Sequence, residues 1–281
     1  MFQRIENSWA LAKASWAVLR ADKELIVFPV VSAIAAIVVT LSFMLPFVAA
    51  GMFSAFTENN SASQATAVIV GFLFYVVQYT VIFFCNTALV GAALIRLRGG
   101  DPTVRDGFRI ASQHFGSIVG YALISATVGM VLRWIRERGI LGQIAAGLFG
   151  LAWNIATYLV VPVLVMENVG PLEAVRRSTA LLKKTWGEQI VGNLGIGAVF
   201  GLLFVLLLLL GVPLMALAAS ANSAALIALV ILLWVLAFIA LGLLSSALNG
   251  IYTAAVYQYV ATGEPGATFD EALVKNAFRA K

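Results

Sequence analysis

The chain has 281 residues, of which 62% are hydrophobic and 11% are charged, and its formal net charge is +5 at pH 7. An ordinary soluble domain carries about 25% charged residues, so this composition excludes a fold solvated by water alone. We expect an all-α, polytopic transmembrane helical bundle that forms one integral membrane domain over residues 1–281.

Stretches without Asp, Glu, Lys or Arg locate the membrane-spanning helices, since a crossing needs roughly 20 apolar residues. The longest stretch, residues 189–263, exceeds one crossing, and Pro213 together with the polar run 220–223 predicts a break within it. The sequence therefore predicts six spans in three hairpins, at residues 25–49, 66–95, 115–132, 144–166, 189–217 and 224–260. Tilt, extension into water, or kinks at prolines would accommodate the longer spans. These prolines are Pro29, Pro46, Pro162 and Pro213.

The first 24 residues are predicted to form a helix on the membrane surface. Charges are scattered through this segment, unlike a secretory signal peptide with its apolar core and cleavage site. Helical spacing places Lys13 and Arg20 at the rim of an apolar arc, where their stems can reach the interface. The arc consists of Phe2, Ile5, Trp9 and Trp16.

Two further charged segments have the pattern of basic interfacial helices. In the first of them, Asp101 is the expected N-cap and Pro102 the first-turn proline. Its apolar stripe consists of Val104, Phe108, Ala111, Phe115 and Ile118. The other begins near Pro171, and its stripe consists of Leu172, Val175, Thr179, Leu182 and Trp186.

Each surface helix precedes one hairpin, which suggests three similar units at residues 1–100, 101–169 and 170–281. The alternative is a chance similarity among basic helices next to the membrane.

The distribution of basic residues predicts the orientation. If six spans alternate, all but three of the 18 Lys and Arg residues lie on one side, which the positive-inside rule assigns to the cytoplasm. We therefore expect a multi-pass protein of the cytoplasmic membrane with both termini in the cytoplasm. The three exceptions are Arg133, Arg136 and Arg138.

Four asparagines within predicted spans are candidates for a pore or a polar core. They are Asn86, Asn154, Asn193 and Asn249, joined by Gln78, Thr157, Ser245 and Ser246. Polar side chains in a bilayer are costly and therefore invite a functional interpretation. The alternative is hydrogen bonding between helices, which contributes about 0.6–2 kcal/mol.

Basic side chains in the surface helices are candidate contacts for anionic lipid headgroups, at about 1 kcal/mol each. These are Arg105, Arg109, Arg176, Arg177, Lys183 and Lys184. Arg133, Arg136 and Arg138 could likewise reach lipid phosphates, or could attract anions to an outer vestibule.

The sequence provides few residues for catalysis. It has a single histidine, His114, and a single cysteine, Cys85, so a histidine-based metal site or a serine nucleophile with a histidine base is not expected. We therefore expect that the protein is not an enzyme and that it binds no metal ion and no cofactor. Membrane lipids are the expected partners and nucleic acid is not. Association into a homo-oligomer stays open, since the pairs Gly116–Gly120 and Gly197–Gly201 permit close packing within or between subunits.

Two functions from different classes remain. The first is a non-enzymatic membrane protein with lipid-interacting or scaffolding work. The second is a passive pore or small-solute facilitator lined by the intramembrane asparagines.

Four segments resemble a family of uncharacterised prokaryotic six-span membrane proteins. They are residues 84–93, 102–109, 158–167 and 173–178. The chain is also loosely similar to the membrane domain of glycerophosphodiester phosphodiesterases, although no catalytic domain of that kind is present. The resemblance implies a bacterial or archaeal cytoplasmic-membrane protein and supplies no catalytic residues.

The predicted topology can be tested by cysteine labelling on a Cys85→Ala background. Ser61→Cys and Ser223→Cys are expected to react with a membrane-impermeant thiol reagent added outside the cell, and Thr103→Cys is expected to react only after permeabilisation. Labelling of Thr103→Cys in intact cells would contradict the orientation.

Overall fold

A computed structural model describes residues 2–49, 61–186, 195–221 and 223–263. Helices make up nearly all of this part of the chain, and it contains no strand. The helices are α1 (Phe2–Ala21), the 3-10 turn η1 (Lys23–Ile26), α2 (Val27–Ala49), α3 (Ser61–Leu97), α4 (Val104–Gln113), α5 (Phe115–Arg136), α6 (Ile140–Ala156), α7 (Val160–Glu167), α8 (Pro171–Trp186), α9 (Gly195–Ser220) and α10 (Ala224–Thr262).

Six segments of the described chain are long and apolar enough to cross a membrane, which confirms the predicted class. They are η1 with α2, then α3, α5, α6 with α7, α9 and α10. Consecutive spans pack as the pairs α2–α3, α5–α6 and α9–α10. The division into three similar units is not tested by this arrangement and stays a prediction.

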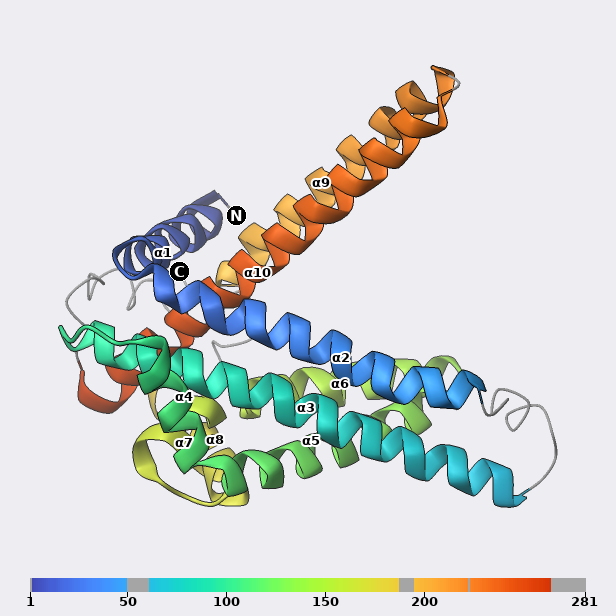
Figure 1. Ribbon diagram of the computed structural model, residues 1–281. Coiled ribbons are helices and arrows are strands. Elements are labelled where there is room, and N and C mark those ends of the chain that lie inside the picture. Colours follow the sequence, from blue (N-terminus) through green and yellow to red (C-terminus); the bar gives the residue numbers. More distant parts are fainter. Residues whose placement is uncertain (1, 50–60, 187–194, 222, 264–281) are drawn as a thin grey trace.

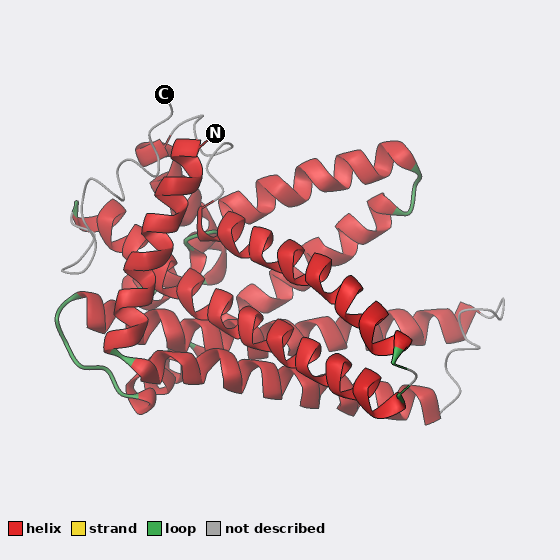
Figure 2. Ribbon diagram, turned by 90° about the horizontal axis from the view of Figure 1, so that it is seen from above, coloured by secondary structure: helices red, strands yellow, loops and turns green. Residues whose placement is uncertain are grey.

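The spans converge at one end of the molecule, which we call the basal end. It is formed by α1, α4, α7 and α8 with the C-terminal parts of α3 and α10 (Figure 1). From this end α2, α3, α5 and α6 run outward together, whereas the α9–α10 hairpin leans away from them (Figure 1). Figure 2 shows the same separation from above.

Tight packing is concentrated at the basal end. The largest fully buried side chains belong to α1, η1, the start of α2, the end of α3, the start of α5, the Leu159–Leu164 region, α8 and the end of α10. They are Leu11, Leu25, Phe28, Leu89, Leu94, Leu97, Ile118, Leu159, Leu164, Leu182 and Ile251. Beyond them the spans expose large apolar side chains, such as Leu45 at 64% and Leu209 at 64%. In a membrane protein this outer zone, here called the apolar band, contacts lipid.

Close contact between helices depends on a few glycines. A Cβ added to Gly211 of α9 would overlap the Trp234 indole of α10, whose Nε1 donates to the Leu207 carbonyl oxygen at 3.0 Å. A Cβ on Gly120 would approach Pro171 Cγ to 2.8 Å, so this glycine packs within the chain. Gly197 and Gly201 have open space at the same position.

The helix α4 begins two residues later than the sequence predicted. Its N-cap is Thr103 rather than Asp101, because Thr103 and Asp106 form a capping box. The Asp106 N–H donates to Thr103 Oγ1 at 3.2 Å, and the Thr103 N–H donates to Asp106 Oδ2 at 3.1 Å. The predicted stripe is also divided, since α4 ends at Gln113 and Phe115 starts the next span.

The buried faces of α1 and α8 differ from the predicted stripes. In α1, Leu11, Ser15 and Val18 are buried, whereas Trp9 and Trp16 are 49% and 46% exposed. Because Leu11, Ser15 and Val18 pack inward, the tryptophans on the opposite face are left free for the interface. The side chains of Phe2 and Ile5 lie outside the described residues.

In α8 the buried positions are Ala174, Ser178, Leu181 and Leu182, whereas Leu172, predicted to lie on the apolar stripe, is 72% exposed. The Ser178 hydroxyl explains this rotation, since it accepts the Leu159 N–H at 3.1 Å. A buried backbone donor would otherwise stay unsatisfied.

Pro213 does not form the break that the sequence predicted, whereas Pro162 lies beside an interruption of its span. Pro213 lies inside α9, and the turn between α9 and α10 comes only after Ser220, as membrane helices tolerate proline. The fourth span is interrupted at Thr157–Leu159, just before Pro162 in the first turn of α7. A proline is accepted in a first turn, where its missing N–H has no intrahelical partner.

Packing of α4 on α2 and α3 can be tested at Gly107. An added Cβ would overlap the Phe28 ring and lie 2.8 Å from the Ala88 carbonyl oxygen. We expect Gly107→Ala to destabilise the protein by about 1–3 kcal/mol through overpacking, measured as a lower Tm in detergent or nanodiscs. The control is Gly116→Ala, where nothing lies within 4 Å; equal Tm values for both variants would contradict this packing.

The capping box of α4 predicts a pH dependence. Hydrogen bonds from the Thr103 hydroxyl and backbone N–H, followed by the charges of Arg109 and Arg105, lower the pKa of Asp106. Because the folded pKa lies below the unfolded one, the stabilisation is present above the ordinary Asp pKa and is lost as the pH falls through the lowered value. We expect the Tm difference between the wild type and Asp106→Asn to shrink on acidification. Asp101→Asn, at a side chain 97% exposed, is the control.

Candidate functional site

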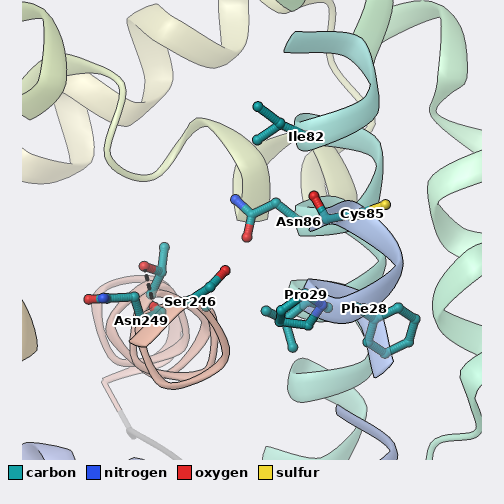
Figure 3. A pocket seen from close by; sticks show the side chains of 11 residues that line it. Phe28, Pro29, Ile82, Cys85, Asn86, Ser246 and Asn249 are labelled. Atoms are coloured by element: carbon teal, nitrogen blue, oxygen red, sulfur yellow. Dashed lines mark hydrogen bonds between the residues drawn. The ribbon is translucent and has the colours of Figure 1, made fainter. Parts of the chain in front are cut away.

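A cavity of about 270 Å³ lies between α2, α3 and α10 and is open on one side. Figure 3 shows Asn86 and Ser246 pointing into this space from α3 and α10. None of its lining residues is charged. They are Phe28, Pro29, Ser32, Ile82, Cys85, Asn86, Leu89, Ser246, Asn249, Gly250 and Thr253. The helices therefore form an intramembrane cavity with an uncharged polar lining.

Gly250 brings α10 close to α3 directly beside the cavity. A Cβ at this position would overlap the Leu89 side chain and would lie 3.6 Å from Asn86 Oδ1. On α2, the buried residues Phe28 and Pro29 complete the basal wall. The cavity consequently sits where the tight basal packing gives way to the apolar band.

Some polar groups that line the cavity have hydrogen-bond partners among the residues that the structure describes, and others have none there. Asn249 donates from Nδ2 to the Ser245 carbonyl oxygen at 2.9 Å and to Ser245 Oγ at 3.3 Å. Thr253 donates from Oγ1 to the Asn249 carbonyl oxygen at 2.8 Å. Within the described part of the chain, neither the Asn86 amide nor the Ser246 hydroxyl has a hydrogen-bond partner. These two groups are free to bind a ligand.

The structure brings together two of the four predicted asparagines. Asn86 and Asn249 line the cavity, whereas Asn154 is exposed on α6 and does not. Asn193 lies outside the described residues. Both lie along this cavity because Gly250 lets α10 approach α3, but the Asn249 amide points away from Asn86 (Figure 3).

The sequence analysis proposed only Asn86, Ser246 and Asn249 of the lining residues, and the polar residues Ser32 and Thr253 and the close-packed Gly250 are among those that it missed. Ser32 and Thr253 are polar residues within predicted spans, so a search of the spans for every hydroxyl would have included them. Gly250 carries no such signal, because its importance arises only from the approach of α10 to Leu89.

A second polar cluster holds α7, α8 and α10 together at the basal end. Arg177 Nε donates to both oxygens of Glu167, at 3.1 and 2.8 Å. The Tyr257 hydroxyl donates to Glu167 Oε1 at 3.3 Å. The Glu167 side chain is 23% exposed. Arg177 and Tyr257 compensate the negative charge that this partly buried carboxylate carries.

The candidate headgroup contacts occupy both ends of the molecule. Arg105, Arg109, Arg176, Arg177 and Lys183 are exposed at the basal end, while the Lys184 side chain lies outside the described residues. Arg133, Arg136 and Arg138 are exposed at the far end of α5. There Arg133 pairs with Glu137 at 3.2 Å, and the Arg138 guanidinium lies 3.7 Å from the Trp134 ring centroid.

Asp22 caps η1 at the basal end, close to where the chain enters the first span. Its Oδ1 accepts the Glu24 N–H at 3.2 Å, and its Oδ2 has no partner in the described part of the chain. Burial raises the pKa of Asp22, an effect partly opposed by the Glu24 hydrogen bond and by the charge of Arg96. Glu24 in turn accepts the Val104 N–H at 2.7 Å and so joins η1 to α4.

The described residues contain no group of three or more His, Cys, Asp or Glu side chains that could hold a metal ion. The chemistry that the cavity offers is hydrogen bonding by amide and hydroxyl groups next to an apolar wall.

Comparison with curated proteins gives no match, and the looser similarity to the membrane domain of glycerophosphodiester phosphodiesterases gains no support. One family does match, over residues 65–267, which include most of α3, all of α4 to α10 and most of the cavity lining. The expectation of an uncharacterised family is thus confirmed. With well over half of its length matched, the chain belongs to the family of unknown function DUF6159.

Proposed function

We propose that this protein is a non-enzymatic, lipid-binding protein of the cytoplasmic membrane that holds the polar part of an amphipathic molecule in the cavity between α2, α3 and α10. The observation that carries this proposal is the Asn86 amide, which faces the cavity and has no hydrogen-bond partner within the described chain. Asn86 is half-buried, and a hydrogen bond that a ligand makes to its amide would contribute about 0.5–1.5 kcal/mol.

The position of the cavity supports entry from the lipid. On its outer side, α2 and α10 continue into the apolar band, where Ile34 and Ile239 are 58% and 50% exposed. Here α10 leans away from α2 together with α9 (Figure 1). Acyl chains can therefore lie against both helices while the polar group occupies the cavity.

The basic residues support an orientation with the basal end in the cytoplasm. Exposed arginines such as Arg105, Arg109 and Arg176 would then lie at the inner leaflet and contact anionic headgroups. In the same orientation, Trp9 and Trp16 on the outward face of α1 would sit at the membrane interface, where tryptophan is enriched. Lipids would thus surround the entrance to the cavity.

A passive pore is the alternative, favoured by the polar groups of Asn86, Ser246 and Asn249 on one cavity. A pore would need such groups along a complete crossing, but outward from the cavity α10 carries a run of exposed apolar side chains from Leu226 to Ile239. This pattern favours binding of a lipid over conduction.

The proposal predicts site-specific labelling in nanodiscs by lipid probes that carry a diazirine next to the glycerol, one a diacylglycerol and the other a phosphatidic acid. At least one probe should label peptides from α2, α3 or α10 at the cavity. We expect Asn86→Leu to reduce this labelling roughly fivefold, which corresponds to one lost hydrogen bond of about 1 kcal/mol.

The matched control is Asn154→Leu, which changes an exposed asparagine outside the cavity and should leave the labelling unchanged. Labelling that is the same in both variants, or absent with both probes, would refute lipid binding at this site. Solute flux through liposomes that Asn86→Leu abolishes would instead establish the pore.

A further inference from the structure

We infer that the cavity between α2, α3 and α10 selects an uncharged, hydroxyl-bearing head group, such as that of a diacylglycerol, and rejects a head group with an ionised phosphate. This inference rests on the proposed lipid binding and specifies the chemical class of the ligand.

The first argument is the absence of charge from the lining, which consists of apolar, amide, hydroxyl and thiol side chains. An ion transferred from water into such surroundings loses several kcal/mol of solvation, which a charged partner or several converging hydrogen-bond donors must restore. The next arginines along α3 are Arg96 and Arg98. They follow Asn86 by ten and twelve residues, about 15 Å or more along the helix, and neither lines the cavity.

The second argument is the kind of hydrogen bonds still available. The Asn86 amide offers donors and an acceptor, and the Ser246 hydroxyl offers one donor and an acceptor. The Asn249 amide is directed away from Asn86 (Figure 3) and is already bonded to Ser245, so it does not add to this set. A ligand that satisfies the Asn86 amide and the Ser246 hydroxyl must both donate and accept. A hydroxyl group does both, whereas a fully ionised phosphate group only accepts.

The third argument is size. The cavity of about 270 Å³ corresponds to roughly nine times the share of liquid volume of one water molecule, about 30 Å³. It is smaller than the 300–1,000 Å³ typical of sites for drug-sized ligands. A glycerol-sized head group fits this space, while two acyl chains must remain outside in the apolar band.

The test uses the full-length protein in nanodiscs and the labelling of cavity peptides by the diacylglycerol probe. Unlabelled diacylglycerol and phosphatidic acid with identical acyl chains are added as competitors, so that only the phosphate differs. We expect phosphatidic acid to compete at least about tenfold more weakly. Equal or stronger competition by phosphatidic acid would overturn the inference.

A second variant tests the charge argument directly. Ser246→Arg places a guanidinium on the exposed rim of the cavity and should shift the preference toward phosphatidic acid, whereas Ser246→Ala should weaken labelling by the diacylglycerol probe without that shift. An unchanged preference in Ser246→Arg, with the variant shown to be folded by size-exclusion chromatography, would contradict the inference.

The experiment distinguishes failure of lipid binding from failure of head-group selectivity. If the phosphatidic acid probe labels the cavity in an Asn86-dependent way and the diacylglycerol probe does not, the selectivity is wrong and lipid binding survives. If neither probe gives Asn86-dependent labelling, lipid binding at this site and its selectivity both fail.

Discussion

The packing of the basal end is the constraint on which the rest of the structure depends. In hydrocarbon, apolar side chains gain little from contacting one another rather than lipid, so helix association relies on close packing and hydrogen bonds. This protein makes those contacts where α1, α4, α7 and α8 surround the ends of α3 and α10, and the partly exposed Glu167–Arg177–Tyr257 cluster adds polar contacts there. The outer parts of α2, α3, α5 and α6 pack against one another, whereas the outer parts of α9 and α10 pack mainly on each other, which lets this hairpin lean away.

The cavity follows from this division into two zones. Where α10 leaves α2 and α3, the side chains no longer fill the space between the helices, and Gly250 marks the last position of very close approach to Leu89. The polar groups of Asn86 and Ser246 face this space. A polar group is expensive in pure hydrocarbon and becomes useful where a ligand can satisfy it, which connects the geometry of the fold to the proposed binding of a lipid head group.

The spans could be predicted from the sequence because a charge is excluded from hydrocarbon so strongly that charge-free stretches outline each crossing. The exact ends of helices could not be predicted in this way, because they depend on which of several nearby side chains forms the better cap or turn. Thr103 replaced Asp101 as the N-cap of α4 because Asp106 stands at the right spacing to complete its box. Pro213 did not end α9, since a helix surrounded by lipid and protein has no water to satisfy its backbone if it unwinds.

The candidate site was only partly predictable, and the reason is geometric. Nothing in the sequence distinguishes Asn86, which meets α10, from Asn154, which is exposed on α6, because that difference depends on how each helix is rotated in the bundle. The same limit applies to α8, where the hydrogen bond from the Leu159 N–H to Ser178 sets the rotation and turns Leu172 outward.

The lengths of α3 and α10 have a mechanical consequence. With 37 and 39 residues, these helices are about 55 and 58 Å long, nearly twice the thickness of the hydrocarbon. Neither contains a proline, so each runs as one rod from the basal core into the bilayer. Long helices tilt to match the thickness of the membrane around them. A thinner or thicker bilayer that changes the tilt of α10 therefore also turns Ser246 and Asn249, and the width of the cavity becomes a property of the surrounding membrane as well as of the protein.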